Sequence, residues 1–221
     1  RQRQMCIRDR TYVTFSEDKN IIADEIIENH NEKYHSAFLI PVIAQILKSN
    51  SISMKDIDVI GTNIGPGSFT GIRACVTVAR VIAQQLNIPL VGVSSLEILS
   101  HINDTDELTT VVLDARKQQY YTAQYSNGKE LKAPSLTNAD DVLNFDFKNG
   151  RVIADEASGT FLKNAGIASE IYTEMNADLG RILNQIVCNK IQNCNKDDFL
   201  WGKLKPLYLQ APPVTISAKA K

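Results

Sequence analysis

The chain has 221 residues, of which 43% are hydrophobic and 22% charged, a composition typical of a globular protein with a sizeable core. No apolar run approaches the roughly 18 residues that a membrane-spanning helix needs, so none is expected. The formal net charge is −1, whereas free-standing nucleic-acid binders contact phosphates through clustered Lys and Arg. These numbers argue against direct RNA binding as the main role.

Residues 1–10, RQRQMCIRDR, differ from the rest of the chain. They contain four arginines and one aspartate, with no periodicity and no apolar core of the kind that a secretory signal has. We interpret them as a non-native leader. Without it the formal charge changes from −1 to −4, because four positive charges and one negative charge are removed.

The four cysteines, Cys6, Cys75, Cys188 and Cys194, form no CxxC pair and have no histidine at ligand spacing. This pattern predicts neither a disulfide framework nor a zinc site. We therefore expect a reduced, cytoplasmic protein.

The first hundred residues alternate between strand and helix patterns. Two β-branched runs around a turn-like segment, Thr11–Phe15 and Ile21–Ile27, predict a hairpin. The next predicted elements are the helix Glu32–Lys48, the strand Ile57–Ile64, the glycine-rich turn Gly65–Gly71, the helix Ile72–Leu86, the strand Pro89–Val93 and the helix Ser95–His101. This order predicts an α/β layer with a mixed sheet.

The polar stretch Asn103–Glu107 interrupts this pattern and predicts a domain boundary. It divides the chain into an N-terminal lobe at 11–102, a C-terminal lobe at 103–204 and an extended tail at 205–221. Predicted elements of the second lobe are strands Thr109–Leu113, Tyr120–Tyr125 and Val152–Ala154 and helices Asn138–Leu143 and Asn176–Ile191.

A glycine-rich loop joins a predicted strand to a predicted helix. Its residues are Gly65, Pro66, Gly67, Ser68, Phe69, Thr70 and Gly71. Glycines at such a turn allow backbone N–H groups to converge near a helix N-terminus, which favours a phosphate cradle. They equally allow a tight turn with close packing of strand on helix. A Walker loop has Lys beside its last glycine, whereas Ile72 and Arg73 follow here.

The segment GPGSFTGIR at 65–73, followed by IPLVGVSSLEIL at 88–99, resembles the signature of the TsaB (YeaZ) family. Further segments are similar to that family in the same order. They are HSAFLIPVIAQIL at 35–47, LDARKQQYY at 113–121 and PLYL at 206–209. The resemblance extends from about Thr11 to Val214.

The resemblance implies a two-lobed actin-like ATPase fold with mixed sheets. In that family the first strand ends in Asp followed by a small hydroxyl residue, and here the leader stands in its place. We therefore expect the first strand of the N-terminal sheet to be missing from this sequence.

The related catalytic subunit TsaD carries two metal-binding histidines four residues apart after the strand that corresponds to Pro89–Val93. Here those positions hold Ser95 and Leu99, neither of which replaces an imidazole. We expect no catalytic residue, no metal and no cofactor, with ATP and metal on partner subunits.

Asp114 and Arg116 are marked by the resemblance and follow an apolar strand. A turn-stabilising charge pair is the interpretation that we favour over acid–base chemistry.

Two helices predict a partner surface. Between Ala37 and Leu47 only Pro41 and Gln45 are not plainly apolar, although a surface helix needs an apolar stripe of only about 100°. Composition leaves open whether both helices are internal to the chain, whereas the resemblance implies an interface. The interface that we expect is centred on Phe38, Leu39, Val42, Ile46, Arg73, Val76 and Arg80. Charges at Val76 and Leu39 are expected to abolish pairing without unfolding the monomer.

The implied function is that of a non-catalytic subunit in threonylcarbamoyl transfer to the adenosine next to the anticodon of tRNAs. It would heterodimerise with a TsaD-like catalytic subunit, help to recruit a TsaE-like ATPase, and form a homodimer when alone. It would meet tRNA only through the complex. The alternatives are a nucleotide-dependent small-metabolite kinase or a metal-dependent hydrolase of the same fold, and a homodimeric scaffold with no tRNA role.

Overall fold

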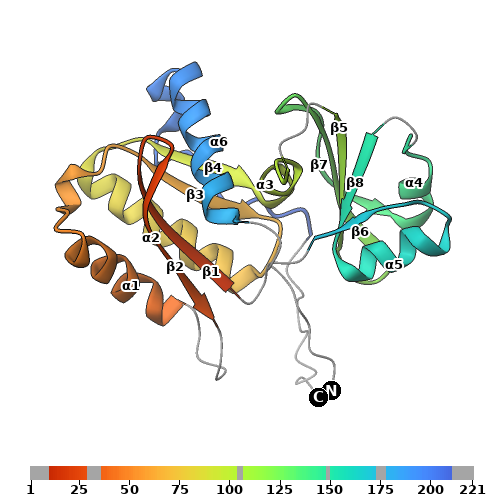
Figure 1. Cartoon of the computed structure of the whole chain (residues 1–221), viewed down its shortest axis with the longest axis horizontal. Helices are drawn as coiled ribbons and strands as arrows, with labels where there is room; N and C mark the ends of the chain where they lie inside the picture. Colours follow the sequence, from red (N-terminus) through yellow and green to blue (C-terminus); the bar gives the residue numbers. More distant parts are fainter. Residues whose placement is uncertain (1–9, 29–35, 104–106, 148–149, 173–177, 211–221) are drawn as a thin grey trace, which may run out of the picture.

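The computed structural model describes residues 10–28, 36–103, 107–147, 150–172 and 178–210. They form a mixed α/β structure in which two small sheets lie on one side and a five-stranded sheet lies on the other (Figure 1). The predicted α/β class with mixed strand pairing is confirmed, since both parallel and antiparallel ladders occur.

The elements of the first half follow the predicted order. They are β1 (Arg10–Glu17), β2 (Asn20–Glu28), α1 (Ser36–Ser49), the 3-10 helix η1 (Met54–Asp56), β3 (Ile60–Gly65), α2 (Phe69–Leu86), β4 (Leu90–Ser94) and α3 (Ser95–Ser100). β1 and β2 form the predicted antiparallel hairpin, and β3 pairs in parallel with β4. The predicted helix start at Glu32 lies outside the described residues.

The elements of the second half are more numerous than predicted. They are β5 (Leu108–Asp114), β6 (Gln119–Ser126), β7 (Lys129–Asn138), α4 (Ala139–Leu143), β8 (Gly150–Ala154), α5 (Glu156–Asn164), β9 (Glu170–Ile171), α6 (Leu179–Asn193) and the 3-10 helix η2 (Lys196–Phe199). The sheet order is β7-β6-β5-β8-β9. β5 lies at its centre, antiparallel to β6 and parallel to β8, and its apolar run is almost fully buried.

Two strands and one α-helix, β7, β9 and α5, have no counterpart in the prediction. β7 carries two lysines and Pro134, and most of its N-terminal half is exposed, as is common for an edge strand. α5 has a weak apolar pattern and begins at an N-cap. The Asp155 carboxylate accepts a hydrogen bond from the backbone N–H of Ser158 at 2.8 Å.

The long helix α6 returns the chain to its first half. It contacts β1, β3, β4 and α3, although a boundary at 103 places its sequence in the second lobe. Close approach depends on two glycines: a Cβ at Gly61 would collide with Val187, and one at Gly180 would collide with Thr14. A sequence pattern predicts that such a helix is amphipathic, but not which layer it covers.

One of three apolar clusters connects the two halves and forms the central core. Its buried residues come from β4, α3, β5, β6, β8 and α6 and include Val91, Val93, Leu96, Leu99, Val111, Leu113, Ala123, Ile153, Ile186 and Val187. The short helix α3 is almost entirely buried at the centre of this core. Within the described residues, no helix combines the length and the apolar character needed to cross a membrane.

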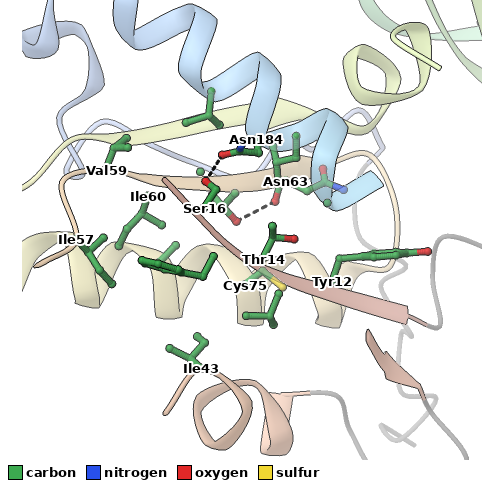
Figure 2. Close-up of a pocket in the computed structure, with 18 of the residues that line it drawn as sticks. Tyr12, Thr14, Ser16, Ile43, Ile57, Val59, Ile60, Asn63, Cys75 and Asn184 are labelled. Carbon is green, nitrogen blue, oxygen red and sulfur yellow. Dashed lines mark hydrogen bonds between the residues drawn. The ribbon is translucent and has the colours of Figure 1, made fainter. Parts of the chain in front are cut away.

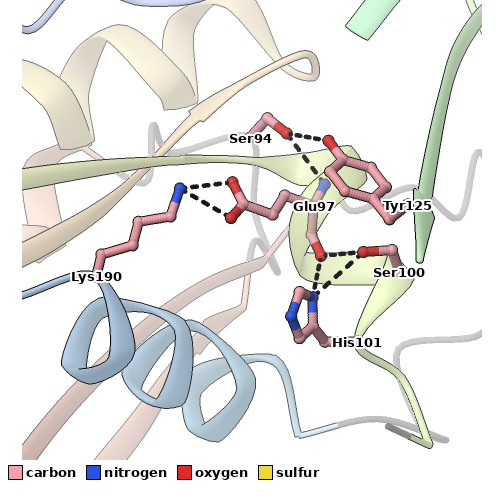
Figure 3. Close-up of polar contacts among 6 residues, drawn as sticks. All are labelled: Ser94, Glu97, Ser100, His101, Tyr125 and Lys190. Atoms are coloured by element: carbon pink, nitrogen blue, oxygen red, sulfur yellow. Dashed lines mark hydrogen bonds and ion pairs between the residues drawn. The ribbon is translucent and has the colours of Figure 1, made fainter. Parts of the chain in front are cut away.

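An ion pair holds α6 against α3 (Figure 3). Lys190 Nζ lies 2.8 Å from Oε1 of Glu97 and donates a hydrogen bond to Oε2 at 2.9 Å. Both side chains are largely shielded from water, so the pair is screened less than a surface pair.

Removal of Leu99 should test the central core. Leu99 is 0% exposed, so Leu99→Ala should lower the free energy of unfolding by about 2–5 kcal/mol through lost burial and a residual cavity. Leu131→Ala is the matched control, because Leu131 is 63% exposed and its truncation should change stability by less than about 0.5 kcal/mol. Urea unfolding measures both changes, and equal effects would contradict the described core.

The ion pair of α6 generates a second prediction. Lys190→Met should lower the free energy of unfolding by about 1–3 kcal/mol, between the values for exposed and buried pairs. Arg181→Met is the control on the same helix, since the Arg181–Asp178 pair is exposed and should contribute at most about 1 kcal/mol. A thermal unfolding series that ranks Arg181→Met as the more damaging change would refute this assignment.

Candidate functional site

The glycine loop forms a sharp turn between β3 and α2. Gly65 has a φ of 101°, in the region that favours glycine, and the Gly65–Pro66 peptide bond is cis. The backbone N–H of Gly65 donates to Oδ1 of Asn63 at 2.8 Å. Asn63 therefore fixes the start of the turn from within β3.

The helix after the loop starts earlier than predicted. Ser68 is the N-cap of α2, and its Oγ accepts a hydrogen bond from the backbone N–H of Gly71 at 3.4 Å. The predicted start at Ile72 is therefore wrong by three residues. Phe69, Thr70 and Gly71 form the first helical turn. The helix can begin this early because the Ser68 side chain accepts a hydrogen bond from a backbone N–H that has no partner within the helix.

The chain's tail packs over this loop. The backbone N–H of Leu207 donates to the carbonyl oxygen of Ile64 at 2.8 Å. A Cβ at Gly65 would lie 2.8 Å from Cδ1 of Ile72 and 3.4 Å from the carbonyl oxygen of Leu207. This crowding supports the close-packing interpretation of the glycines. Phosphate binding by the loop stays a prediction.

Aromatic contacts extend the same junction. The rings of Phe69 and Tyr208 lie 5.2 Å apart between centroids, and the Arg73 guanidinium lies 5.1 Å from the Phe69 centroid. The predicted tail at 205–221 has neither helix nor strand from 205 to 210, and its remainder lies outside the described residues.

The turn after β5 has an unusual backbone. Arg116, Lys117 and Gln118 have φ values of 67°, 53° and 58°, three consecutive non-glycine residues in the left-handed region. Each costs about 1–2 kcal/mol relative to ordinary backbone. Asp114 Oδ1 accepts a hydrogen bond from the backbone N–H of Arg116 at 2.9 Å. Asp114 thus stabilises the turn through the Arg116 backbone, and the charge pair between the two side chains stays a prediction.

Gln210 connects this turn to the tail, and the sequence analysis missed it. Its Nε2 donates to the Ala115 carbonyl oxygen at 2.9 Å, and its Oε1 accepts from the Tyr121 hydroxyl at 3.0 Å. The turn after β5 and the glycine loop therefore both contact one short tail segment. The only sequence signal was that LDARKQQYY and PLYL belong to the same family pattern.

The predicted interface residues fall into two groups. Phe38 and Arg73 are exposed, and Val42 and Arg80 are half-buried. Leu39, Ile46 and Val76 are buried inside this chain. A charge at Leu39 or Val76 would therefore disrupt the fold of this chain first, contrary to the expectation that the monomer would stay folded.

Other apolar side chains remain uncovered on the same two helices. Ile40 on α1 is 61% exposed, Val81 on α2 is 52% exposed, and Phe38 is 44% exposed. α1 and α2 contact each other, so these side chains belong to one helix pair. We call these exposed residues of the pair, Phe38, Ile40, Arg73 and Val81, the helix-pair surface. Phe38 and Ile40 project about 200° apart around α1, on either side of the buried Leu39.

Ser95 and Leu99, the two positions that the family resemblance aligns with the metal-binding histidines of TsaD, are in the core. Leu99 is fully buried, and Ser95 is buried with its Oγ donating to Oδ1 of Asn63 at 3.0 Å. In the described part of the chain, no three His, Cys, Asp or Glu side chains are grouped so as to hold a metal ion.

Neighbouring polar groups serve structural contacts (Figure 3). The Tyr125 hydroxyl lies 3.3 Å from Ser94 Oγ, and burial raises the pKa of Tyr125 above its ordinary value. Tyr125 is therefore neutral at physiological pH. His101 Nδ1 lies 2.9 Å from the Glu97 carbonyl oxygen and 3.2 Å from Ser100 Oγ, which ties the end of α3 together.

Residues 20–209 match a family model described as "TsaD: tRNA N6-adenosine threonylcarbamoyltransferase". The tRNA threonylcarbamoyladenosine biosynthesis protein TsaB of Bacillus subtilis is 37% identical over 114 residues, which cover 50% of this chain and 49% of that protein. The protein of the same name from Buchnera aphidicola subsp. Baizongia pistaciae is 29% identical over 130 residues, covering 53% and 58%. The chain thus aligns with about half the length of these curated relatives.

Solved structures match a larger share of the chain. YeaZ from Pseudomonas aeruginosa has a TM-score of 0.68 at 18% identity, over 91% of this chain and 95% of that one. A second Pseudomonas aeruginosa structure, described as similar to peptidase YEAZ, has a TM-score of 0.69 over 92% and 95%. These likenesses establish the fold. The family match over residues 20–209 and the identity to the curated TsaB relatives show that the chain belongs to the TsaB/YeaZ family.

Proposed function

We propose that this chain is a non-catalytic subunit in the biosynthesis of threonylcarbamoyladenosine in tRNA. The family membership supports this role, because its curated relatives are named as biosynthesis proteins for that modification. The chain's contribution is to bind a TsaD-like catalytic subunit, which transfers the threonylcarbamoyl group to the adenosine next to the anticodon.

The observation that carries the proposal is the helix-pair surface. Leu39, Ile46 and Leu47 attach α1 to its own chain, while Phe38 and Ile40 stay exposed on the same helix. Exposed apolar side chains rimmed by a cation are typical of protein–protein interfaces. The partner is therefore expected to place apolar side chains on Phe38, Ile40 and Val81 and an acidic group beside Arg73.

The two-lobed actin-like ATPase fold is part of the same proposal. The N-terminal lobe spans 11–102 and the C-terminal lobe 103–204, with α6 crossing back onto the first lobe. In this arrangement the helix-pair surface belongs to the N-terminal lobe. The C-terminal sheet stays free to contact other members of the complex.

The chain acts on its partner by linkage. A subunit that binds one conformation of the catalytic partner shifts the population toward that conformation. ATP and metal belong to the partner subunits, and tRNA reaches this chain only within the complex. The assembled pair recruits a TsaE-like ATPase, and in the absence of TsaD the helix-pair surface pairs with a second copy of itself.

Complex formation tests the proposal directly. Mixed with TsaD from the same genome, the chain should elute as one species whose light-scattering mass equals one copy of each. The double variant Phe38→Asp/Val81→Asp should weaken this complex by about tenfold or more, because buried interface anchors contribute more than 1 kcal/mol each. Unshifted, separate peaks for the unmodified chain would remove the proposal.

A matched control separates interface loss from misfolding. Leu131→Asp places the same charge at an exposed apolar position on β7, outside the helix-pair surface, and should leave the complex mass unchanged. The unmodified chain, the double variant and Leu131→Asp should all have the same thermal unfolding midpoint within about 4 °C. Equal weakening by Leu131→Asp would show that the helix-pair surface is not the contact.

A further inference from the structure

Apolar and aromatic contacts attach the tail to the first half of the molecule. Trp201 and Leu204 pack on an apolar cluster that α2 and β4 share. Further along, the backbone of Leu207 is bonded to the end of β3, and the ring of Tyr208 lies against that of Phe69 at the start of α2. The tail is therefore anchored on the first half up to Tyr208.

Two residues later the tail reaches the second half through the side chain of Gln210. Its Nε2 donates to the carbonyl oxygen of Ala115 at 2.9 Å and to Oε1 of Gln119 at 3.4 Å, while its Oε1 accepts from the Tyr121 hydroxyl at 3.0 Å. A side-chain amide carries both a donor and an acceptor, so one side chain contacts both ends of the turn after β5. Ala115 is buried, which shields the backbone contact from water.

The left-handed backbone of this turn is not held by its own side chains. Arg116, Lys117 and Gln118 are all exposed, and none is glycine, asparagine or aspartate, the residue types that adopt this conformation most readily. Two backbone bonds close the turn: the N–H of Gln119 donates to the carbonyl oxygen of Arg116 at 3.1 Å, and that of Ala115 donates to the carbonyl oxygen of Gln119 at 2.9 Å. The strain must therefore be balanced by contacts from outside the three residues.

These outside contacts come from two places. From the second half, the Asp114 carboxylate accepts from the backbone N–H of Arg116, and the backbone N–H of Ala139 donates to the carbonyl oxygen of Gln118 at 3.2 Å. From the tail comes the amide of Gln210. The conformation of the turn thus depends in part on whether the tail is docked on the first half.

The docked end of the tail is accessible from outside. Tyr208 is 49% exposed and Phe69 is 40% exposed, and the Arg73 guanidinium lies over the Phe69 ring. This junction borders the helix-pair surface, because Arg73 belongs to both. A contact made at the surface of the first half can therefore reach the segment that carries Gln210.

We propose that residues 207–210 form a latch, which couples the surface around Phe69 and Arg73 to the conformation of the turn at 114–119. When the latch is docked, Gln210 holds the turn in its left-handed form. When it is undocked, the turn relaxes, and the exposed cations Arg116 and Lys117 change direction. The device is a two-state turn whose equilibrium the tail biases. It goes beyond the proposed function, since it operates in the chain alone.

Amide hydrogen exchange of the full chain, followed residue by residue by NMR, tests the latch. Gln210→Ala should speed exchange of the Ala115 and Gln119 amides by about tenfold, because the hydrogen bonds from Gln210 to the turn are lost and the turn opens more often. The amides of Val111 and Val112 are the internal reference, since β5 is paired on both sides and makes no contact with Gln210 at these positions. Their exchange should not change.

A second variant tests the coupling from a distance. Tyr208→Ala removes the ring contact with Phe69 on the first half and leaves Gln210 in place. Exchange of the Ala115 and Gln119 amides should still rise, by about threefold, because an aromatic pair that docks the latch is lost.

Two matched controls accompany these variants. Lys205→Ala changes an exposed tail residue ahead of the latch. Asn193→Ala removes an exposed side-chain amide that donates to the Asn189 carbonyl oxygen within α6. Both controls should leave the exchange of the turn amides unchanged.

Several results would overturn the proposal. The latch is wrong if Gln210→Ala leaves the turn amides unchanged, or if it speeds the turn and the β5 amides by the same factor, which would indicate a general loss of stability. The coupling is wrong if Tyr208→Ala has no effect on the turn, or if Lys205→Ala has an equal one. None of these outcomes bears on binding to TsaD, because every measurement is made on the chain alone.

Discussion

The burial of α3 between the two halves of the molecule is the contact on which the other features depend. Leu96 and Leu99 project from a helix of six residues into a core shared by β4, β5 and α6. Helices this short are unstable alone, so α3 exists because tertiary packing covers nearly all of it. The core sets the position of β4, and through β4 that of β3 and the glycine loop.

The tail adds a second constraint, because it brings together motifs that lie far apart in the sequence. Leu207 contacts the end of β3, Tyr208 contacts Phe69 at the start of α2, and Gln210 contacts the turn after β5. The strained residues 116–118 are thereby held on the side of the molecule that carries the glycine loop. A strained backbone of this kind persists only where the surrounding contacts hold it in place.

Two unrelated surfaces follow from the way that α1, α2 and α6 cover the small sheets. The outer sides of α1 and α2 leave Phe38, Ile40 and Val81 exposed, which suits a protein partner. Their inner sides, together with α6, line a cavity between β1 and β3 (Figure 2).

The sequence alone determined the α/β class, the hairpin, the order of elements up to α3 and the family, because periodicity and the GPGSFTGIR segment are local signals. It did not determine β7, α5 or β9, whose polar or weakly periodic residues become strand and helix only through their neighbours. Only the tertiary structure decided that Leu39, Ile46 and Val76 face inward while Ile40 and Val81 face outward. Likewise, only the structure showed α6 packing on the first sheets and Gln210 connecting two motifs. The physical reason is that burial and side-chain hydrogen bonds depend on which surfaces meet, and that information is non-local in the chain.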